Sequence, residues 1–262
     1  MNQHLFSAII LLSMSLSASA QRVMKVEKAD GTVVEVPVTD VKRVFFEEEE
    51  PDAAVKAGLC PDNHHPHIID LGFDVKWACC NVGAHSPEEY GDYFAWGETT
   101  PQTIYDWSTY KWCKGTDNTM TKYCTDSSYG TVDNKLTLEL SYDGDNTDDA
   151  ARANWGVPWR MPTIDEVYAD SNGLLSCKDE WTTLNGVNGR KFTGPNGNSI
   201  FLPVAGYRFT GGPINVGFTG VYWSSTLYES EPDCAYIFGL GSGAADWGYF
   251  DRDGGISVRP VR

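Results

Sequence analysis

The sequence predicts an α+β fold in which a few short helices precede a run of antiparallel strands. Two segments, Ser86 to Glu89 and Thr163 to Glu166, match the capping box, in which a hydroxyl and a carboxylate satisfy free amides at a helix start. After Trp181, short aromatic and β-branched runs alternate with Asn-Gly pairs, which is the pattern of strands joined by tight turns. The 26 glycines and the 13% aromatic content also favour many short strands over long helices.

Three segments precede the main domain. Residues 1–20 contain no Asp, Glu, Lys or Arg, and their apolar run ends at Ala18-Ser19-Ala20, which predicts a secretory signal peptide. Residues 21–50 alternate apolar and polar side chains around Asp30-Gly31, a pair typical of a β-hairpin turn. Residues 51–67 follow a run of four glutamates and are expected to be a linker.

Residues 68–262 are expected to form one domain. We predict helices after Ser86 (ending at Gly91), from Asp148 to Asn154 (ending at Gly156), and after Thr163. The pairs Asn188-Gly189 and Asn196-Gly197 are predicted to be turns between strands. Further strands are expected in the segments VYWSSTLY, CAYIFGLG, AADWGYF and ISVRPVR.

Charge and hydropathy exclude two classes of partner. The chain has 36 acidic and 20 basic residues, a net charge of −16, which repels phosphate backbones and argues against nucleic-acid binding. No segment after residue 20 is apolar enough over about 20 residues to predict a transmembrane helix. An extracytoplasmic location, secreted, periplasmic or at the cell surface, follows from the signal peptide.

An acidic turn is the weak candidate for a metal site. Asp143, Asp145, Asp148 and Asp149 could offer oxygen ligands to calcium, but four carboxylates fall short of the six or more oxygens that calcium needs. The favoured interpretation is a helix entry, where Asp side chains cap free amides. No cofactor is predicted, and the chain lacks the Gly-x-Ser-x-Gly, His-Glu-x-x-His and phosphate-loop motifs, so an enzyme is not predicted.

Seven cysteines in an exported chain predict disulfides and at least one free thiol. Cys113 and Cys124 are close enough in sequence to close one loop. Cys60 precedes a strand-like segment and could reach either Cys79 or Cys80. The remaining cysteines are expected to be small buried side chains.

Many separated motifs resemble one known family. IDLGFDVKWACCNVGA, SPEEYGDYFAWGETTP, DDAARANWG, WRMPT, WTTLNGVNGRKFTGPNGNSIFLPVAGYR, VYWSST and SVRPVR occur in the order found in the Fibrobacter succinogenes major paralogous domain. The resemblance covers about residues 68–262 and implies a C-type-lectin-like fold in an exported protein of the Bacteroidetes. The N-terminal hairpin is similar to a module that often precedes this domain.

The resemblance bears on the cysteines and on catalysis. Many relatives have Thr where this chain has Cys79, so Cys79 and Cys60 are extra cysteines that are expected to pair with each other. The segment WRMPT is similar to one in formylglycine-generating enzymes, which depend on a pair of late cysteines. Here Cys234 is the only late cysteine, so that activity is the less favoured alternative.

The last 29 residues, from Cys234 to Arg262, contain no Lys, Glu, Gln or Met, although these types make up 33 of the 262 residues. This bias is similar to that of proteins diversified by retroelements, whose adenine-directed mutagenesis does not reach those residues. An ordinary Gly-rich hairpin explains the bias equally well. In the first interpretation Ser242, Trp247, Arg252 and Gly255 form the framework. The exposed ligand-binding residues are then expected to be Ile237, Gly239, Gly241, Gly243, Ala244, Asp246, Gly248, Tyr249, Phe250, Asp251, Asp253 and Gly254.

The sequence therefore predicts a binding protein that presents a C-terminal recognition face to a protein or glycan ligand. A structural protein of the surface layer or matrix, with no specific ligand, is the alternative.

Overall fold

The computed structural model describes residues 23–27, 32–37, 68–140 and 147–262. The chain divides into two compact units, residues 1–51 and 52–262. In the first unit, β1 (Val23–Glu27) pairs antiparallel with β2 (Val33–Pro37), and Val23 lies opposite Pro37. The Asp30-Gly31 turn and the linker lie outside the described residues.

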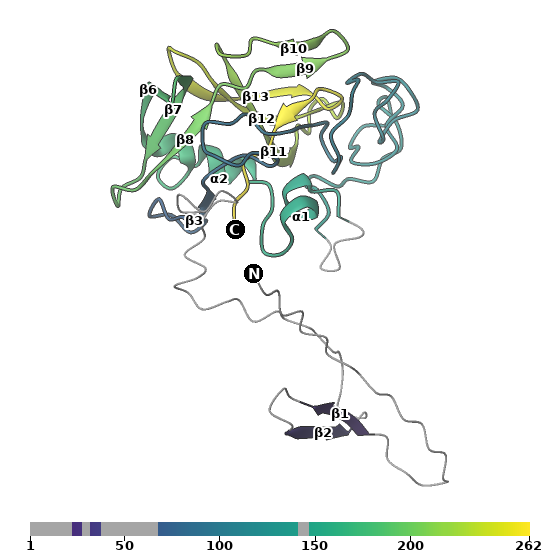
Figure 1. Cartoon of the computed structure of the whole chain (residues 1–262). Coiled ribbons are helices and arrows are strands. Elements are labelled where there is room, and N and C mark those ends of the chain that lie inside the picture. The colour runs from purple at the N-terminus through teal and green to yellow at the C-terminus, as the bar shows by residue number, and fades with distance from the viewer. Residues whose placement is uncertain (1–22, 28–31, 38–67, 141–146) are drawn as a thin grey trace. The chain divides into compact units, whose positions relative to one another are not determined.

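The second unit consists mainly of antiparallel strands with few short helical segments, an architecture compatible with the predicted α+β class (Figure 1). Its elements in chain order are β3 (Ile68–Ile69), β4 (Trp77–Ala78), β5 (Tyr93–Phe94), α1 (Ala150–Trp155), α2 (Ile164–Tyr168), the 3-10 helix η2 (Leu174–Ser176), β6 (Lys178–Leu184), β7 (Val187–Thr193), β8 (Ser199–Pro203), β9 (Tyr207–Phe209), β10 (Gly212–Ile214), β11 (Gly220–Leu227), β12 (Cys234–Leu240), β13 (Ala245–Asp251) and β14 (Ile256–Ser257).

The largest sheet has the strand order β13-β12-β11-β14-β5, and β13 forms one edge. Only the contact between β11 and β14 is parallel. Successive residues of β11 enter different hydrophobic clusters, because Trp223 lies in one and Tyr222 in the other. Side chains alternate between the two faces of a strand. The centre of this sheet is therefore buried on both faces.

The two helices begin where the sequence predicted them. The Asp149 side chain caps α1 by accepting a hydrogen bond from the Arg152 amide, and Gly156 ends the helix with a φ of 75°. Thr163 and Glu166 form both bonds of the capping box at the start of α2. The helix predicted after Ser86 is wrong. Its residues form a turn, because Gly91 has a φ of 71° and the chain then returns to bond Val82 through the Asp92 amide.

The smaller sheet β6-β7-β8 corrects one turn prediction. The turn between β6 and β7 is Asn185-Gly186, whose φ values of 48° and 84° suit a two-residue hairpin turn. The predicted turn pair Asn188-Gly189 lies inside β7 instead. Gly189 is needed there because a Cβ atom would lie 2.3 Å from the Phe201 ring. The second predicted turn, Asn196-Gly197, does connect β7 to β8.

The predicted Cys113–Cys124 disulfide is wrong, because both residues are free cysteines. Each thiol instead donates to a backbone carbonyl, Cys113 to Trp107 at 3.1 Å and Cys124 to Asp126 at 3.0 Å. Closeness in sequence was therefore not sufficient for Cys113 and Cys124 to form a disulfide. Cys79 is disulfide-bonded. Its expected partner, Cys60, lies outside the described residues, so that pairing stays a prediction.

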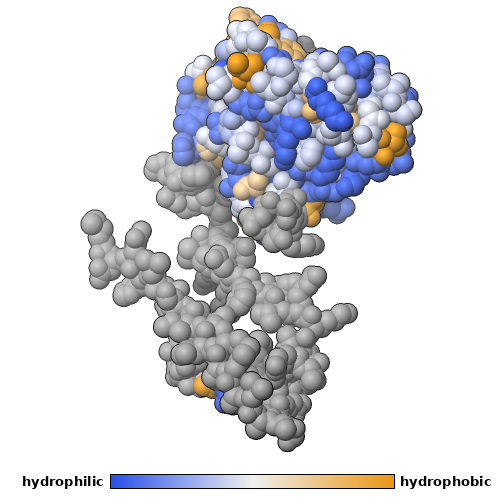
Figure 2. Space-filling view, turned by 90° about the vertical axis from the view of Figure 1, so that its right-hand side faces the viewer, coloured by the Kyte–Doolittle hydropathy of each residue, from blue (hydrophilic) through white to orange (hydrophobic). Residues whose placement is uncertain are grey.

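The surface of the second unit agrees with the high net charge. Figure 2 shows one of its faces, where hydrophilic residues predominate and hydrophobic ones form small separate areas. Among the described residues, no helix is long and apolar enough to cross a membrane.

Candidate functional site

The candidate site lies on the β12–β13 hairpin, at the edge of the largest sheet (Figure 1). Tyr236 of β12 lies opposite Tyr249 of β13, and Phe238 lies opposite Trp247. Residues directly opposite each other in antiparallel strands share a face. Near the sheet centre this face is core, where Phe238 is fully buried. Toward Tyr236 and Tyr249 the same face reaches solvent.

Five aromatic rings form a continuous series on that face. We name this series the aromatic strip; its members, in order of contact, are Tyr168, Trp247, Tyr236, Tyr228 and Tyr249. Centroid separations between successive rings are 5.7, 5.7, 5.1 and 4.2 Å. The last pair is stacked with an interplanar angle of 3°. Three different parts of the chain supply the rings: α2, the segment after β11, and the β12–β13 hairpin.

The strip is exposed although its rings are large. Tyr168, Trp247 and Tyr249 are 49%, 39% and 47% exposed. None of the five rings belongs to a hydrophobic core cluster of the described residues. Contiguous apolar surface of this kind marks interaction sites more often than isolated exposed side chains do.

The predicted ligand-binding residues do not form one patch. Strand alternation places Trp247, Tyr249 and Asp251 on the strip face and Asp246, Gly248 and Phe250 on the opposite face. Phe250 stacks on Phe209 and packs against the core. The predicted residues that are exposed or half-buried are Gly239, Gly241, Gly243, Ala244, Asp246, Gly248, Tyr249, Phe250 and Asp251.

Three of the predicted residues are buried, which corrects their expected exposure. Ile237 is 8% exposed and packs against the core, where Gly248 leaves room beside its side chain. Asp253 is 4% exposed, and Gly254 is buried against the Phe250 ring. The chain turns inward after β13, so sequence neighbours of exposed residues enter the interior.

The expected framework is half correct. Arg252 is fully buried, and Gly255 lies so close to Tyr105 that a Cβ atom would be 2.8 Å from its ring. Framework residues were expected to point inward or to hold the backbone, and Ser242 and Trp247 do not point inward, because both are exposed. Ser242 lies at the hairpin tip between β12 and β13, and Trp247 belongs to the aromatic strip.

Sequence reasoning missed Tyr168, Tyr228 and Tyr236. Tyr168 ends α2, far from the hairpin in sequence, and only the tertiary fold brings it to Trp247. Tyr236 carried a usable signal, because it lies two residues after Cys234 in a strand where Phe238 and Leu240 face the core. A tyrosine on the same face of the strand as two core residues indicates that the core ends there and that its hydroxyl reaches solvent.

Acidic groups lie close to the strip. The charge of Glu231 is the main cause that raises the pKa of Tyr249. Burial raises the pKa of Tyr236, and the neighbouring Tyr228, Glu229 and Asp165 add to the shift. Both phenols are therefore neutral at physiological pH and keep their hydroxyl protons for donation.

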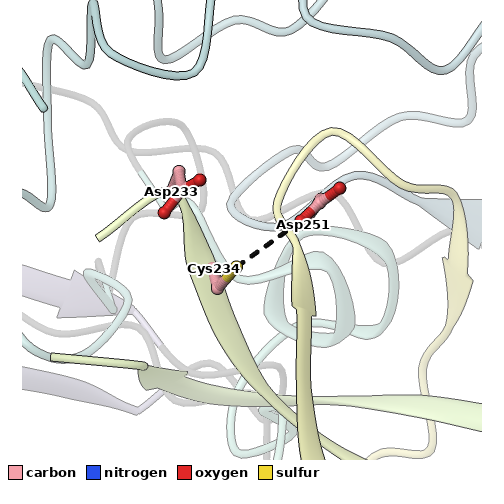
Figure 3. A group of neighbouring side chains, drawn as sticks. All are labelled: Asp233, Cys234 and Asp251. Atoms are coloured by element: carbon pink, nitrogen blue, oxygen red, sulfur yellow. Dashed lines mark hydrogen bonds between the residues drawn. The ribbon is translucent and has the colours of Figure 1, made fainter. Parts of the chain in front are cut away.

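A second cluster lies where β12 begins and β13 ends (Figure 3). Ligand atoms of Asp233, Cys234 and Asp251 lie within 4.8 Å of one another, and the thiol donates to Asp251 at 3.5 Å. Burial, followed by the charges of Asp233 and Asp251, raises the pKa of Cys234. A protonated thiol is a poor metal ligand. We assign no metal to this cluster.

The described members of the predicted acidic turn have internal partners. Asp148 accepts hydrogen bonds from Lys122 and from the Tyr123 hydroxyl. Asp149 accepts from the Arg152 and Met161 amides, as expected for a helix entry. Asp143 and Asp145 lie outside the described residues.

A relationship to formylglycine-generating enzymes would require a pair of reactive cysteines late in the chain. Cys177 and Cys234, the last two cysteines, are poor nucleophiles. Burial raises the pKa of Cys177 to about 11, and the same cause is the largest for Cys234. The thiolate is the reactive form of cysteine, so both side chains are largely unreactive at neutral pH.

The chain was compared with protein-family models, with curated proteins and with solved structures. None of them matches. The resemblance to the Fibrobacter succinogenes major paralogous domain and to the C-type-lectin-like fold therefore stays a prediction from the sequence motifs.

Proposed function

We propose that this chain is an exported binding protein of the C-type-lectin-like type, whose recognition surface is the aromatic strip. The observation that carries the proposal is a series of five contacting rings, three exposed and two half-buried, none of which belongs to a core cluster of the described residues. Aromatic side chains supply a large contact area at low entropic cost and are enriched where binding energy concentrates.

The strip has a rigid support. Tyr236 and Trp247 lie on the paired strands β12 and β13, and β12 is anchored because its residues Phe238 and Leu240 lie in the core. Tyr168 stands at the end of a helix held by a complete capping box. Ring positions fixed in this way before binding reduce the ordering cost that a ligand has to offset.

The test is ligand capture on arrays of glycans and of proteins. Trp247→Ala with Tyr249→Ala removes the two exposed rings of β13 and is expected to weaken capture at least about tenfold, the typical loss for binding hot spots. The matched control is Phe218→Ala, because Phe218 is 77% exposed and makes no ring contact among the described residues. The control is expected to bind normally, and both variants are expected to keep the wild-type Tm.

Two outcomes would overturn the proposal. If the native chain captures no ligand, the alternative of a structural surface or matrix protein replaces it. If the double variant unfolds, the strip is structural.

The compositional bias of the last 29 residues supports a further part of the proposal, a hairpin diversified by a retroelement. The hairpin has exposed positions that tolerate side chains: a Cβ atom at Gly243 meets nothing within 4 Å, and Ala244 is exposed. Sequencing related isolates tests this. Changes are expected at these positions and not at Arg252 or Gly255.

A further inference from the structure

The segments that build the aromatic strip contain no basic residue. No Lys, Arg or His occurs in residues 209–251, which include β11 to β13, or in residues 161–177, which include α2. Residues 227–251 contain five acidic residues, Glu229, Glu231, Asp233, Asp246 and Asp251. The segments that supply the rings therefore have a surplus of negative charge, and Lys135, in the neighbouring segment that bonds to β11, is paired with Glu139.

The guanidinium groups that contact these segments are satisfied within the protein. Arg190 donates to the Gly241 carbonyl and forms an ion pair with Asp179. Arg160 is paired with Glu166 on α2. These internal partners leave the negative charges beside the strip, such as Glu229 and Glu231, available to a ligand.

The strip also lies on an edge strand. β13 pairs with β12 on one side and ends the sheet. The Arg252 amide points toward β12, because it donates to the carbonyl of Asp233, the residue that precedes β12. The Trp247 amide donates to the Asp246 side chain instead. Backbone groups alternate in direction along a strand, so the amides of Trp247 and Tyr249 point away from β12. An extended polypeptide can add to such an edge.

We propose that the aromatic strip and the edge of β13 bind an extended polypeptide segment that bears Lys or Arg side chains. This inference rests on the proposed function and adds the class of ligand. Cationic groups are attracted to the faces of Trp and Tyr rings, and the attraction grows when carboxylates stand nearby. The outward main-chain groups of β13, apart from the Trp247 amide that Asp246 already satisfies, supply a template that a polypeptide matches and a glycan does not.

The test uses a fluorescein-labelled peptide of alternating Lys and Thr, long enough to span the seven residues of β13. Binding is measured by fluorescence anisotropy, with a Glu-Thr peptide of equal length and a neutral oligosaccharide as comparison ligands. The Lys-Thr peptide is expected to bind at least about tenfold more tightly than the Glu-Thr peptide at low salt, and more weakly as salt screens the charges.

Three variants separate the contributions. Glu229→Gln with Glu231→Gln is expected to weaken Lys-Thr binding about tenfold without unfolding the chain. Asp74→Asn with Glu180→Gln changes the net charge equally at exposed positions outside the strip and is expected to have little effect. Trp247→Ala with Tyr249→Ala is expected to abolish binding of the peptide.

The outcomes distinguish this inference from the function on which it rests. Oligosaccharide binding that depends on Trp247, with no peptide binding, would overturn the inference and keep the recognition surface. Peptide binding that survives loss of both rings, or falls equally in both charge variants, would show attraction to net charge alone and would overturn the inference. Binding of none of the three ligands by the native chain would count against the inference, while the array test would still decide the proposed function.

Discussion

Arg252 is a fully buried guanidinium at the end of β13. It donates to the Tyr110 hydroxyl and to the carbonyls of Tyr123, Pro232 and Lys122. The rings of Trp96 and Tyr110 lie 4.9 and 5.3 Å from its central carbon. Buried polar groups persist only when they are hydrogen-bonded. Arg252 therefore fixes the end of the β12–β13 hairpin to the loops that surround it.

Replacement by alanine should have a large effect at one glycine of the C-terminal segment and a small effect at another. Gly255→Ala is expected to destabilise the protein by about 1–3 kcal/mol, because the new Cβ atom would lie 2.8 Å from the Tyr105 ring. Gly243→Ala places its Cβ atom in open space and is expected to change the free energy of unfolding by less than about 0.5 kcal/mol. Chemical denaturation of both variants measures the difference. Equal effects would contradict the division into framework and exposed positions.

Asp253 makes stability depend on pH. Burial, followed by the charge of Asp251, raises the pKa of Asp253 from 3.8 to about 7, and one of its oxygens is buried without a hydrogen-bond partner. The folded chain therefore holds a proton that the unfolded chain releases near pH 4. Stability from this group is complete below that pH and is lost as pH rises to about 7.

The corresponding prediction concerns Asp253→Asn, which keeps a neutral side chain at every pH. Its Tm should fall less than the native Tm between pH 5 and pH 8, and above about pH 7 the variant should be more stable by on the order of 2 kcal/mol. The exposed Asp74→Asn variant is the control and should follow the native profile. A parallel profile for Asp253→Asn would show that the carboxylate is ionised in the folded chain throughout this range.

At the scale of elements, the sequence predicted those features that depend mainly on neighbouring residues, such as helix caps and strand alternation. The capping box at Thr163 and the cap at Asp149 occur where expected. The segments VYWSSTLY, CAYIFGLG and AADWGYF correspond to the expected strands β11, β12 and β13, whereas β10 was not predicted and ISVRPVR forms a strand only at Ile256–Ser257. The wrong turn arose where two local signals compete. Asn185-Gly186 and Asn188-Gly189 are equivalent as turn pairs, and the choice depends on the Phe201 ring, which only the folded sheet places beside Gly189.

The site was predicted only in part for the same physical reason. Alternation along β13 was readable, and it separates Tyr249 from Phe250. The side of β13 that meets solvent depends on neighbours distant in sequence, such as Tyr168 on one face and Phe209 on the other. Composition alone therefore located the hairpin but not the strip.

The capping box of α2 offers a test at this scale. Thr163→Ala removes the hydroxyl that accepts a bond from the Glu166 amide and is expected to cost about 1 kcal/mol. Because α2 contains five residues and ends at Tyr168, its fraying should also loosen the contact between Tyr168 and Trp247. Trp fluorescence and thermal unfolding measure the two effects. Thr163→Ser keeps a hydroxyl and should restore both, whereas unchanged stability in Thr163→Ala would show that the Arg160–Glu166 pair alone holds the helix start.

For the whole molecule, the distribution of cysteines gives a test of its crosslinks. Cys80, Cys113, Cys124, Cys177 and Cys234 carry thiols, and all except Cys113 are buried. A folded chain hides buried thiols from a reagent, and unfolding exposes them. Cys79 is disulfide-bonded, and Cys60 is the cysteine that the sequence predicts as its partner.

Titration with a thiol reagent therefore has three expected end points. The native chain should react at no more than one thiol, Cys113, and Cys113→Ser should remove that reaction. The unfolded, unreduced chain should show five thiols, and reduction should raise the number to the seven cysteines of the sequence. Reduction should also destabilise the folded chain by about 3 kcal/mol, the loop-entropy value for a crosslink across some twenty residues. Seven reactive thiols before reduction would exclude the crosslink, and three would show a second disulfide among these five cysteines.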